Sequence, residues 1–212
     1  MRKLKIVGIS GSLREDSFNQ MLIQALDQSA RHGCVFSHIS LRDIPVYNQD
    51  DEDEMGIPSL ITEIQSQLEE CDGLLIASPE YNHSIPGVLK NAFDWLTRPA
   101  EKIETVFRDL PVGVVGVTPG KGGTVLAQKA WQPIIQTLGM KPFKLSSLAL
   151  SDADKIFNRS GELIDEQVLG DVEHFMKGYT QFIRDNTRNS LPDYYYRSHQ
   201  EPDSFMSFGW PP

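Results

Sequence analysis

Positive charge, cysteine and long apolar runs are all scarce in this chain of 212 residues. Lys and Arg total 20 against 29 Asp and Glu, so the net charge at pH 7 is -9. A duplex-binding surface needs an excess of positive charge, so we expect no nucleic-acid partner. No stretch approaches the roughly 18 consecutive apolar residues of a membrane span, and residues 1–10 show a strand pattern rather than a signal peptide. We therefore expect no membrane partner and a cytoplasmic location.

Metal and disulfide chemistry have little support. The two cysteines, Cys34 and Cys71, form no CxxC pair, and the five histidines lack the spacing of metal ligands. We expect both cysteines to be buried, reduced thiols and no metal site.

Three common motifs are also missing. Residues 8–13 read GISGSL and do not supply the GxGxxG of a dinucleotide fingerprint, and Ser12 stands where a nucleophile elbow needs glycine. Gly122 follows Lys121 where a P-loop needs Ser or Thr. Rossmann dehydrogenases, serine esterases and P-loop hydrolases therefore lose support.

Short β-rich runs alternate with segments of helical period, which predicts one α/β domain with helices on both faces of a doubly wound, five-stranded parallel sheet. The acidic run at residues 50–54 is interpreted as a solvated loop. We expect strands at residues 4–9, 35–39, 73–77, 112–117 and 142–150. We expect helices at residues 17–32, 57–68, 86–96 and 162–184, and one more helix that follows the glycine-rich turn after the fourth strand and ends at about residue 138.

Ligands of such sheets lie beyond the carboxyl ends of the strands, so the loops after the first, third and fourth strands are the candidate site. The first loop combines Ser10, Ser12, Ser17 and Asn19 with the single cation Arg14. Hydroxyl donors at a helix N-terminus suit a phosphate. The same residues also suit a plain helix cap and turn, so this loop alone leaves two interpretations open.

The other two loops favour a flat ligand. In residues 78–87 two prolines stiffen a backbone that carries Tyr81 and Asn82, which suits a heteroaromatic ring. Ser84 and Pro86 also fit an ordinary helix start. Residues 118–124 place three glycines after the fourth strand, which allows either close approach to a ligand or a flexible connection.

Taken together, the GSLRxxSxN loop, the SPEYNxSxPGxLKNAxDW segment at residues 78–95 and the glycine-rich third loop resemble the NADPH-dependent FMN reductase family of flavodoxin-like quinone, chromate and azo-dye reductases. The resemblance covers about residues 3–184, with a weaker matching segment at 41–48. It implies a non-covalent FMN and NADPH or NADH as co-substrate. The cofactor-binding residues that it implies are Ser10, Ser12, Leu13, Arg14, Ser17, Asn19, Pro79, Glu80, Tyr81, Asn82, Ser84, Thr118, Gly120 and Gly123.

The expected function is an NAD(P)H-dependent, FMN-containing oxidoreductase that passes electrons to a small acceptor such as a quinone, azo compound, metal oxyanion or flavin. Because the flavin carries the chemistry, no catalytic side chain is predicted, and the backbone of Glu80 is expected to matter more than its carboxylate. The alternatives are an FMN-binding electron carrier acting on a protein partner and a flavin-binding sensor. The first loop's Arg14 and the PEYN segment favour the enzyme.

Two further expectations concern assembly. The helix at residues 86–96 carries two apolar stripes, of which one should cover the sheet and the second needs a partner. Core packing alone explains both stripes if the C-terminal segment covers the outer one. The family resemblance implies a homodimer or homotetramer. We expect residues 1–188 to form the FMN-binding domain, and the aromatic-rich residues 189–212 to be an extension that docks on this domain or on a neighbouring subunit.

Overall fold

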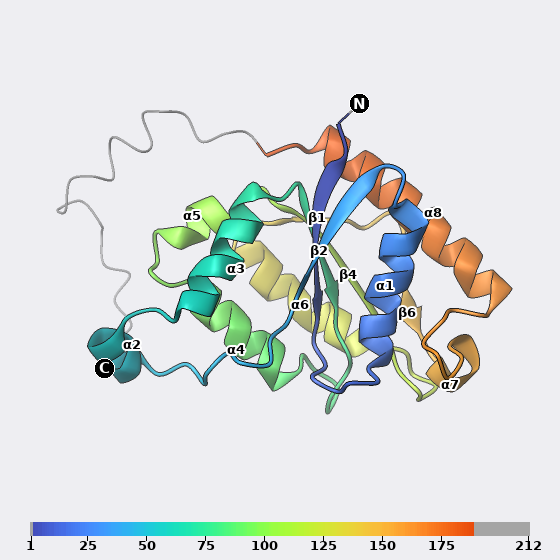
Figure 1. Cartoon of the computed structure of the whole chain (residues 1–212), viewed down its shortest axis with the longest axis horizontal. Coiled ribbons are helices and arrows are strands. Elements are labelled where there is room, and N and C mark those ends of the chain that lie inside the picture. Colours follow the sequence, from blue (N-terminus) through green and yellow to red (C-terminus); the bar gives the residue numbers. More distant parts are fainter. Residues whose placement is uncertain (1, 189–212) are drawn as a thin grey trace.

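The computed structural model describes residues 2–188, so the expected docking of residues 189–212 lies outside the described residues. Its centre is a parallel sheet with strand order β2-β1-β3-β4-β5, and β6 also pairs with β4 (Figure 1). The strands are β1 (Leu4–Ser10), β2 (Cys34–Ile39), β3 (Gly73–Ala77), β4 (Pro111–Val117), β5 (Lys141–Pro142) and β6 (Ala149–Leu150). The expected doubly wound α/β architecture is confirmed.

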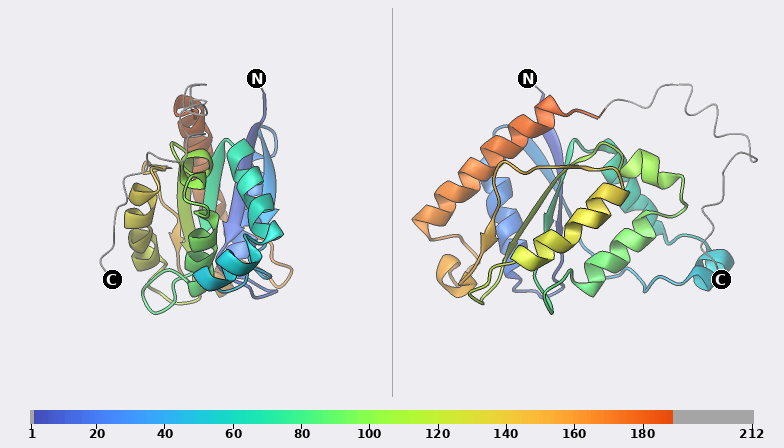
Figure 2. Two further views of the ribbon diagram at one scale, coloured as in Figure 1. Left: turned by 90° about the vertical axis from the view of Figure 1, so that its left-hand side faces the viewer. Right: turned by 180° about the vertical axis from the view of Figure 1, so that it is seen from behind.

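Helices cover both faces of the sheet, as Figures 1 and 2 show. On one face lie α1 (Phe18–Ala30) and α8 (Glu166–Asp185), which pack on each other. On the other lie α3 (Ser59–Glu70), α4 (Gly87–Leu96), α5 (Lys102–Val106) and α6 (Val125–Thr137). Two short helices, α2 (Gln49–Met55) and α7 (Ala153–Ile156), lie in connections.

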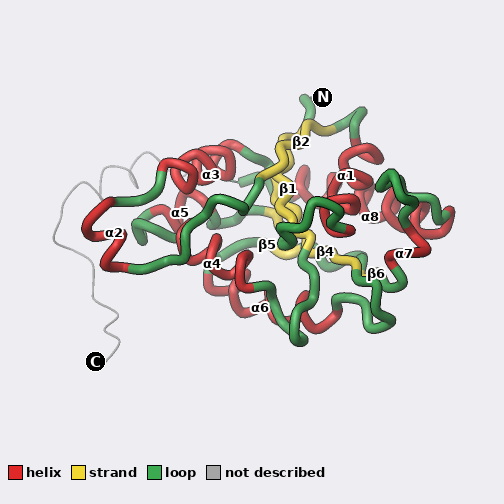
Figure 3. The backbone as a smooth tube through the Cα atoms, turned by 60° about the horizontal axis from the view of Figure 1, so that its bottom comes forward, coloured by secondary structure: helices red, strands yellow, loops and turns green. Residues whose placement is uncertain are grey.

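The middle of the sheet sets the position of the candidate loops. β3 is buried along its whole length because both of its faces are covered, and this explains its unbroken apolar sequence. β1 pairs with β3 through Ile9 and Ile76, and β3 pairs with β4 through Ala77 and Val115. The carboxyl ends of these three strands are therefore neighbours, and the loops that follow them lie side by side at one edge of the sheet (Figure 3).

The fifth strand differs from the expected continuous run over residues 142–150. It consists of two short pieces, because β5 pairs with Pro111 and Val112 while β6 pairs with Gly116 and Val117. Residues 143–148 leave the sheet between them. Lys141 N and Phe143 N donate to Leu110 O and Val112 O, so the missing N–H of Pro142 faces the open edge of the sheet, where proline is tolerated. The sheet has six strands rather than five.

The acidic run is helical, so its interpretation as a loop was wrong. The side chain of Asn48 accepts a hydrogen bond from Asp50 N at 3.1 Å and thereby begins α2. Asp50, Asp51 and Glu52 occupy the first turn, where the helix dipole favours negative charge. Glu52 also accepts hydrogen bonds from Arg98 Nε at 2.8 Å and from the Tyr47 hydroxyl at 3.0 Å, which ties this helix to the domain.

Both apolar stripes of α4 are covered by the chain itself. Phe93 packs on Phe107 and Trp131, with ring centroids 5.5 and 4.8 Å apart. On another side of the helix, Trp95 meets Tyr47 edge to face and donates its indole N–H to Pro45 O at 2.9 Å. Packing within the chain therefore accounts for both stripes, and α4 gives no argument for an oligomer.

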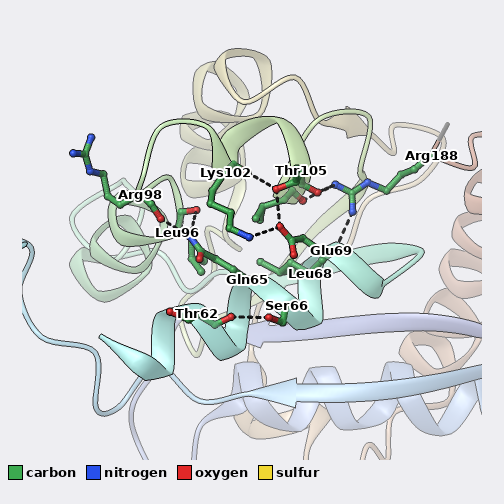
Figure 4. A network of polar contacts seen from close by, with 11 residues as sticks. Thr62, Gln65, Ser66, Leu68, Glu69, Leu96, Arg98, Lys102, Thr105 and Arg188 are labelled. Atoms are coloured by element: carbon green, nitrogen blue, oxygen red, sulfur yellow. Dashed lines mark hydrogen bonds and ion pairs between the residues drawn. The ribbon is translucent and has the colours of Figure 1, made fainter. Parts of the chain in front are cut away.

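A polar network joins α3, α5 and the end of the domain (Figure 4). Glu69 accepts hydrogen bonds from Lys102 Nζ at 2.8 Å and Thr105 Oγ1 at 2.6 Å. The Arg188 guanidinium donates to the carbonyls of Leu68, Thr105, Val106 and Arg108 at 2.7–3.3 Å. We call Gln65, Glu69, Lys102, Thr105 and Arg188 the α3–α5 network.

The two cysteines lie in the interior of the domain. Cys34 and Cys71 are both buried free thiols, as expected. Burial raises the pKa of Cys71 to about 12, so its thiol is inert at neutral pH. Within residues 2–188, no helix is long and apolar enough to cross a bilayer.

Candidate functional site

Three loops meet at the carboxyl edge of the sheet: the first loop (residues 11–17), the second loop (78–86) and the third loop (118–124). They begin in contact, because Gly11 N donates to Ala77 O at 2.9 Å and Ser78 N donates to Val115 O at 2.8 Å. A side chain at Gly11 would collide with Leu89 and come within 2.9 Å of the Pro79 ring. Glycine at position 11 is thus required by packing between the first two loops.

Ser17 satisfies both interpretations of the first loop. Its hydroxyl accepts a hydrogen bond from Gln20 N at 3.3 Å and caps α1, and the same side chain lines a cavity between the three loops. The other N–H groups of the first turn have no intrahelical acceptor, so this helix end can receive an anion. Among the described residues the Arg14 guanidinium makes no hydrogen bond or ion pair, although its backbone N–H donates to Ser12 Oγ.

The Asn19 side chain, expected at the cofactor site, also makes hydrogen bonds within the chain. Its side chain donates to Val117 O at 2.9 Å and accepts from Val117 N at 3.1 Å. Because this buried amide joins the start of α1 to the end of β4, it fixes the separation between the first and third loops. Asn19 therefore acts mainly as a positioning residue.

The second loop is a tight hairpin. Tyr81 and Ser84 exchange both backbone hydrogen bonds, at 3.2 and 3.0 Å. The two residues between them, Asn82 and His83, have positive φ angles of 51° and 61°. This geometry corresponds to a type I′ turn, which favours Asn and leaves the Tyr81 side chain 48% exposed beside the cavity.

The Glu80 carboxylate connects the second loop to α6. Its Oε2 accepts hydrogen bonds from Leu126 N at 2.9 Å and Ala127 N at 3.0 Å, and His83 Nδ1 lies 3.3 Å from its Oε1. Burial acts in the opposite direction, but these partners lower the pKa of Glu80 below its ordinary value. The side chain of Glu80 therefore has a structural function of its own, which the sequence did not indicate.

The glycines of the third loop divide into two kinds. Gly123 has a φ of 62°, and a Cβ there would lie 2.6 Å from Ala149 O, so this glycine is required by the fold. Gly122 has nothing within 4 Å, and the nearest atom to a Cβ at Gly120 is Thr118 Oγ1 at 3.7 Å. Only Gly120 and Gly122 leave open space that a ligand could enter.

The loops enclose a cavity of about 80 Å³, which we call the phosphate cavity. Its dimensions suit a single phosphate group with the start of its chain, and its hydroxyls and its one guanidinium suit the charge of that group. Of the expected site residues it is lined by Ser12, Arg14, Ser17, Asn19, Pro79, Glu80, Tyr81 and Thr118.

The remaining expected residues lie around this cavity rather than on its wall. Ser10 and Leu13 face a second cavity on the β2 side of the first loop. Asn82 and Ser84 belong to the exposed hairpin, Gly120 is at the exposed tip of the third loop, and Gly123 packs against β6.

Sequence reasoning missed one residue that shapes the first loop. Arg42 follows β2 and donates from Nη2 to Leu13 O at 2.7 Å. No short-range signal could have revealed this contact, because the two residues meet only when β2 pairs beside β1. The LRDIPVYN segment gave the one hint, since it was the weaker match to the family pattern.

Comparison with known proteins agrees with this geometry. The sequence model of the NADPH-dependent FMN reductase family matches residues 4–155. The chain is 32% identical over 182 residues to a 2-hydroxy-1,4-benzoquinone reductase of a Burkholderia species, covering 86% of this chain and 97% of that protein. It is 30% identical over 187 residues to a quinone reductase of Escherichia coli K12, covering 86% and 96%.

A solved structure is also similar over its whole length. FerB of Paracoccus denitrificans, described as a flavoenzyme NAD(P)H:(acceptor) oxidoreductase, superposes with a TM-score of 0.79 at 27% identity. The match covers 87% of this chain and 100% of that one.

Proposed function

Because the chain belongs to the NADPH-dependent FMN reductase family and is an NAD(P)H-dependent flavin oxidoreductase acting on small acceptors, we propose that its acceptors are quinones. The observation that carries the proposal is the near full-length similarity to two proteins named quinone reductases, together with a cleft whose rim carries the exposed ring of Tyr81. An exposed aromatic rim suits a planar acceptor.

We further propose that the phosphate cavity holds the phosphate of FMN. Ser12 and Ser17 supply hydroxyls, Arg14 supplies the formal charge, and the first turn of α1 supplies free N–H groups. The hairpin at Tyr81 and the third loop would then flank the ring. When bound, FMN supplies the redox chemistry of the family: it takes hydride from NAD(P)H and delivers electrons to the acceptor.

In this scheme the chain's own residues hold the three loops in place around the cofactor. Asn19 and Glu80 fix the spacing of the three loops, one through β4 and the other through α6. The lowered pKa of Glu80 keeps the carboxylate ionised at neutral pH, in the state that accepts both α6 amides. We therefore assign Glu80 a positioning role and no proton transfer.

We propose a homodimer or homotetramer located in the cytoplasm. Tyr81 at the cleft is 48% exposed, and Val125 and Leu126 in the first turn of α6 are each 42% exposed, so a second copy of the chain could cover these side chains. The two unlinked thiols fit a reducing compartment. Light scattering after gel filtration tests the assembly, and a monomeric mass would overturn it.

A steady-state acceptor panel tests the function. Benzoquinone, naphthoquinone, an azo dye, chromate and free FMN are compared with NADPH and NADH as donors, without any protein partner. We expect the largest kcat/KM with a quinone. A higher value with any other acceptor would refute the quinone assignment, and an absence of turnover with every small acceptor would favour the electron-carrier alternative.

A further inference from the structure

A second cavity lies on the β2 side of the first loop. Its volume is about 240 Å³, and it extends between the ends of β1 and β2. Ser12 and Arg14 line both this cavity and the phosphate cavity, so the two spaces lie on opposite sides of the same loop. Both cavities therefore lie beyond the carboxyl ends of the strands, where doubly wound sheets bind their ligands.

The second cavity is basic in an acidic protein. Two guanidinium groups, those of Arg14 and Arg42, line it together with the His38 ring, and no carboxylate does, although the chain carries a net charge of -9. Asp27 approaches from outside and lies 3.1 Å from His38 Nε2. Positive groups gathered in a concave surface focus the local potential and favour an anion.

The donors of this cavity are available to a ligand. Arg42 uses Nη2 to hold Leu13 O, and within the described residues its guanidinium makes no further hydrogen bond or ion pair. The hydroxyl of Ser40 accepts from Arg42 N at 3.3 Å, which leaves its proton free to be donated. A guanidinium group with a neighbouring hydroxyl is suited to the oxygens of a phosphate monoester, and Arg14 on the shared wall adds positive charge.

The volume limits what can enter. A whole ligand of drug size needs roughly 300–1,000 Å³, so the second cavity takes one phosphate-bearing group and not a complete dinucleotide. The FMN phosphate already has the smaller cavity, which the three loops enclose. NADPH differs from NADH by one phosphate monoester on the adenosine ribose, and it is the other phosphate-bearing molecule of the reaction.

We infer that the second cavity binds the 2′-phosphate of NADPH through Arg42 and Ser40, and so selects NADPH over NADH. The identity of the nucleotide rests on the proposed function, whereas the anion site rests on the cavity itself.

Titration of the FMN-loaded protein tests this inference without turnover. Calorimetry with 2′,5′-ADP, 5′-AMP and inorganic phosphate measures the contribution of the 2′-phosphate directly. We expect 2′,5′-ADP to bind about tenfold more tightly than 5′-AMP, since hydrogen bonds from a guanidinium to a phosphate are charge-assisted. Inorganic phosphate should compete only weakly.

Two variants of the second cavity test whether it binds the 2′-phosphate, and a third variant, away from the cavity, is the matched control. Arg42→Gln removes the charge but also the contact with Leu13 O, so FMN content is measured alongside. Gln20→Glu places a carboxylate on the cavity wall and keeps that contact. Because Ser17 caps α1 and residue 20 is three positions later, glutamate there completes a capping box and should not weaken the helix. Arg31→Gln removes the same charge from the far end of α1, where its Nε donates to Gln28 O.

We expect both cavity variants to abolish the preference for 2′,5′-ADP, to lower the ratio of kcat/KM for NADPH to that for NADH, and to retain FMN. Arg31→Gln should keep the preference. Equal binding of 2′,5′-ADP and 5′-AMP to the wild type, or a preference that survives Gln20→Glu, would overturn the inference. Inorganic phosphate binding as tightly as 2′,5′-ADP would also overturn it, in favour of a site for free phosphate. Failure of the quinone proposal would appear only in the acceptor panel.

Discussion

The α3–α5 network and the loops at the carboxyl edge both concentrate polar groups, but they use them differently. In the network, Arg188 donates to four backbone carbonyls and Glu69 is bonded to Lys102 and Thr105 (Figure 4). At the loops, the Arg14 guanidinium has no partner among the described residues, and the first turn of α1 keeps free N–H groups.

This difference separates groups that hold the fold from groups that await a ligand. A donor that is already bonded within the chain stabilises the native state, and its removal leaves acceptors unsatisfied. A donor that is unpartnered in the folded chain contributes to stability only when its ligand binds. The two arginines 14 and 188 should therefore respond to substitution in opposite ways.

The largest expected effect is on stability at the network. Arg188→Ala deprives four carbonyls of a charged donor, and we expect the free energy of unfolding to fall by about 3 kcal/mol. FMN affinity should be unchanged. Chemical denaturation measures the first quantity and flavin fluorescence the second.

The reactivity of Cys71 measures the loss of the Arg188 contacts locally, because the Cys71 Sγ donates to Leu68 O, which also accepts from Arg188. The thiol should resist labelling in the wild type and react faster in Arg188→Ala. An unchanged unfolding energy with an unreactive thiol would show that this network is dispensable.

A pair of glycines in the third loop gives the next effect. Gly123→Ala forces a side chain toward Ala149 O at a positive φ, and we expect a loss of about 2 kcal/mol in unfolding free energy. Gly122→Ala meets nothing within 4 Å and should leave stability nearly unchanged. Thermal unfolding of both variants in parallel decides the matter. Equal melting temperatures would mean that the two glycines are not of different kinds.

Arg14→Ala should have the opposite effects to Arg188→Ala, with weaker FMN binding and unchanged stability of the FMN-free protein. We expect FMN to bind about tenfold or more weakly, because one charge-assisted phosphate contact is lost. Without FMN the midpoint of denaturation should change little, because the Arg14 guanidinium has no partner in the described part of the chain. Fluorescence titration with FMN measures the affinity, and an unchanged dissociation constant would remove Arg14 from the phosphate site.

The smallest effect belongs to Glu80, which holds the fold and shapes the site. Glu80→Gln weakens the cap on α6 by about 1 kcal/mol, while flavin reduction by NADPH should keep most of its rate. The folded pKa of Glu80 is lowered, so its contribution is present above the ordinary value of 4.5 and is lost as the pH falls through the lowered value.

The stability difference between wild type and Glu80→Gln should accordingly shrink on acidification. Denaturation midpoints at several pH values measure it, and stopped-flow absorbance follows flavin reduction. A hundredfold slower reduction with FMN still bound would mean that Glu80 transfers a proton.

Much of the fold could be read from periodicity. The strands β1, β3 and β4 are apolar and short, and the helices between them carry apolar faces, so a covered parallel sheet followed. The acidic helix α2 was missed because Asn48 was not recognised as its cap, and the interruption of the fifth strand was missed because a run of apolar residues does not show where pairing stops.

The candidate site shows the same division between short and long range. Ser12, Arg14 and Ser17 were found because they lie within a few residues of each other at the start of α1. The contacts of Glu80 with α6 and of Arg42 with Leu13 connect residues 46 and 29 positions apart. No local pattern encodes such pairs.

The sequence by itself determined the class of sheet, the order of its elements and the three loops that face a ligand, because these depend on side-chain period and on residues that are close along the chain. The tertiary structure decided which polar groups in those loops are already hydrogen-bonded within the chain. Asn19 and Glu80 are bound to distant backbone atoms, whereas Arg14 is left available. Hydrogen-bond satisfaction is a property of atoms brought together in space, and only the folded chain fixes which donors remain for a ligand.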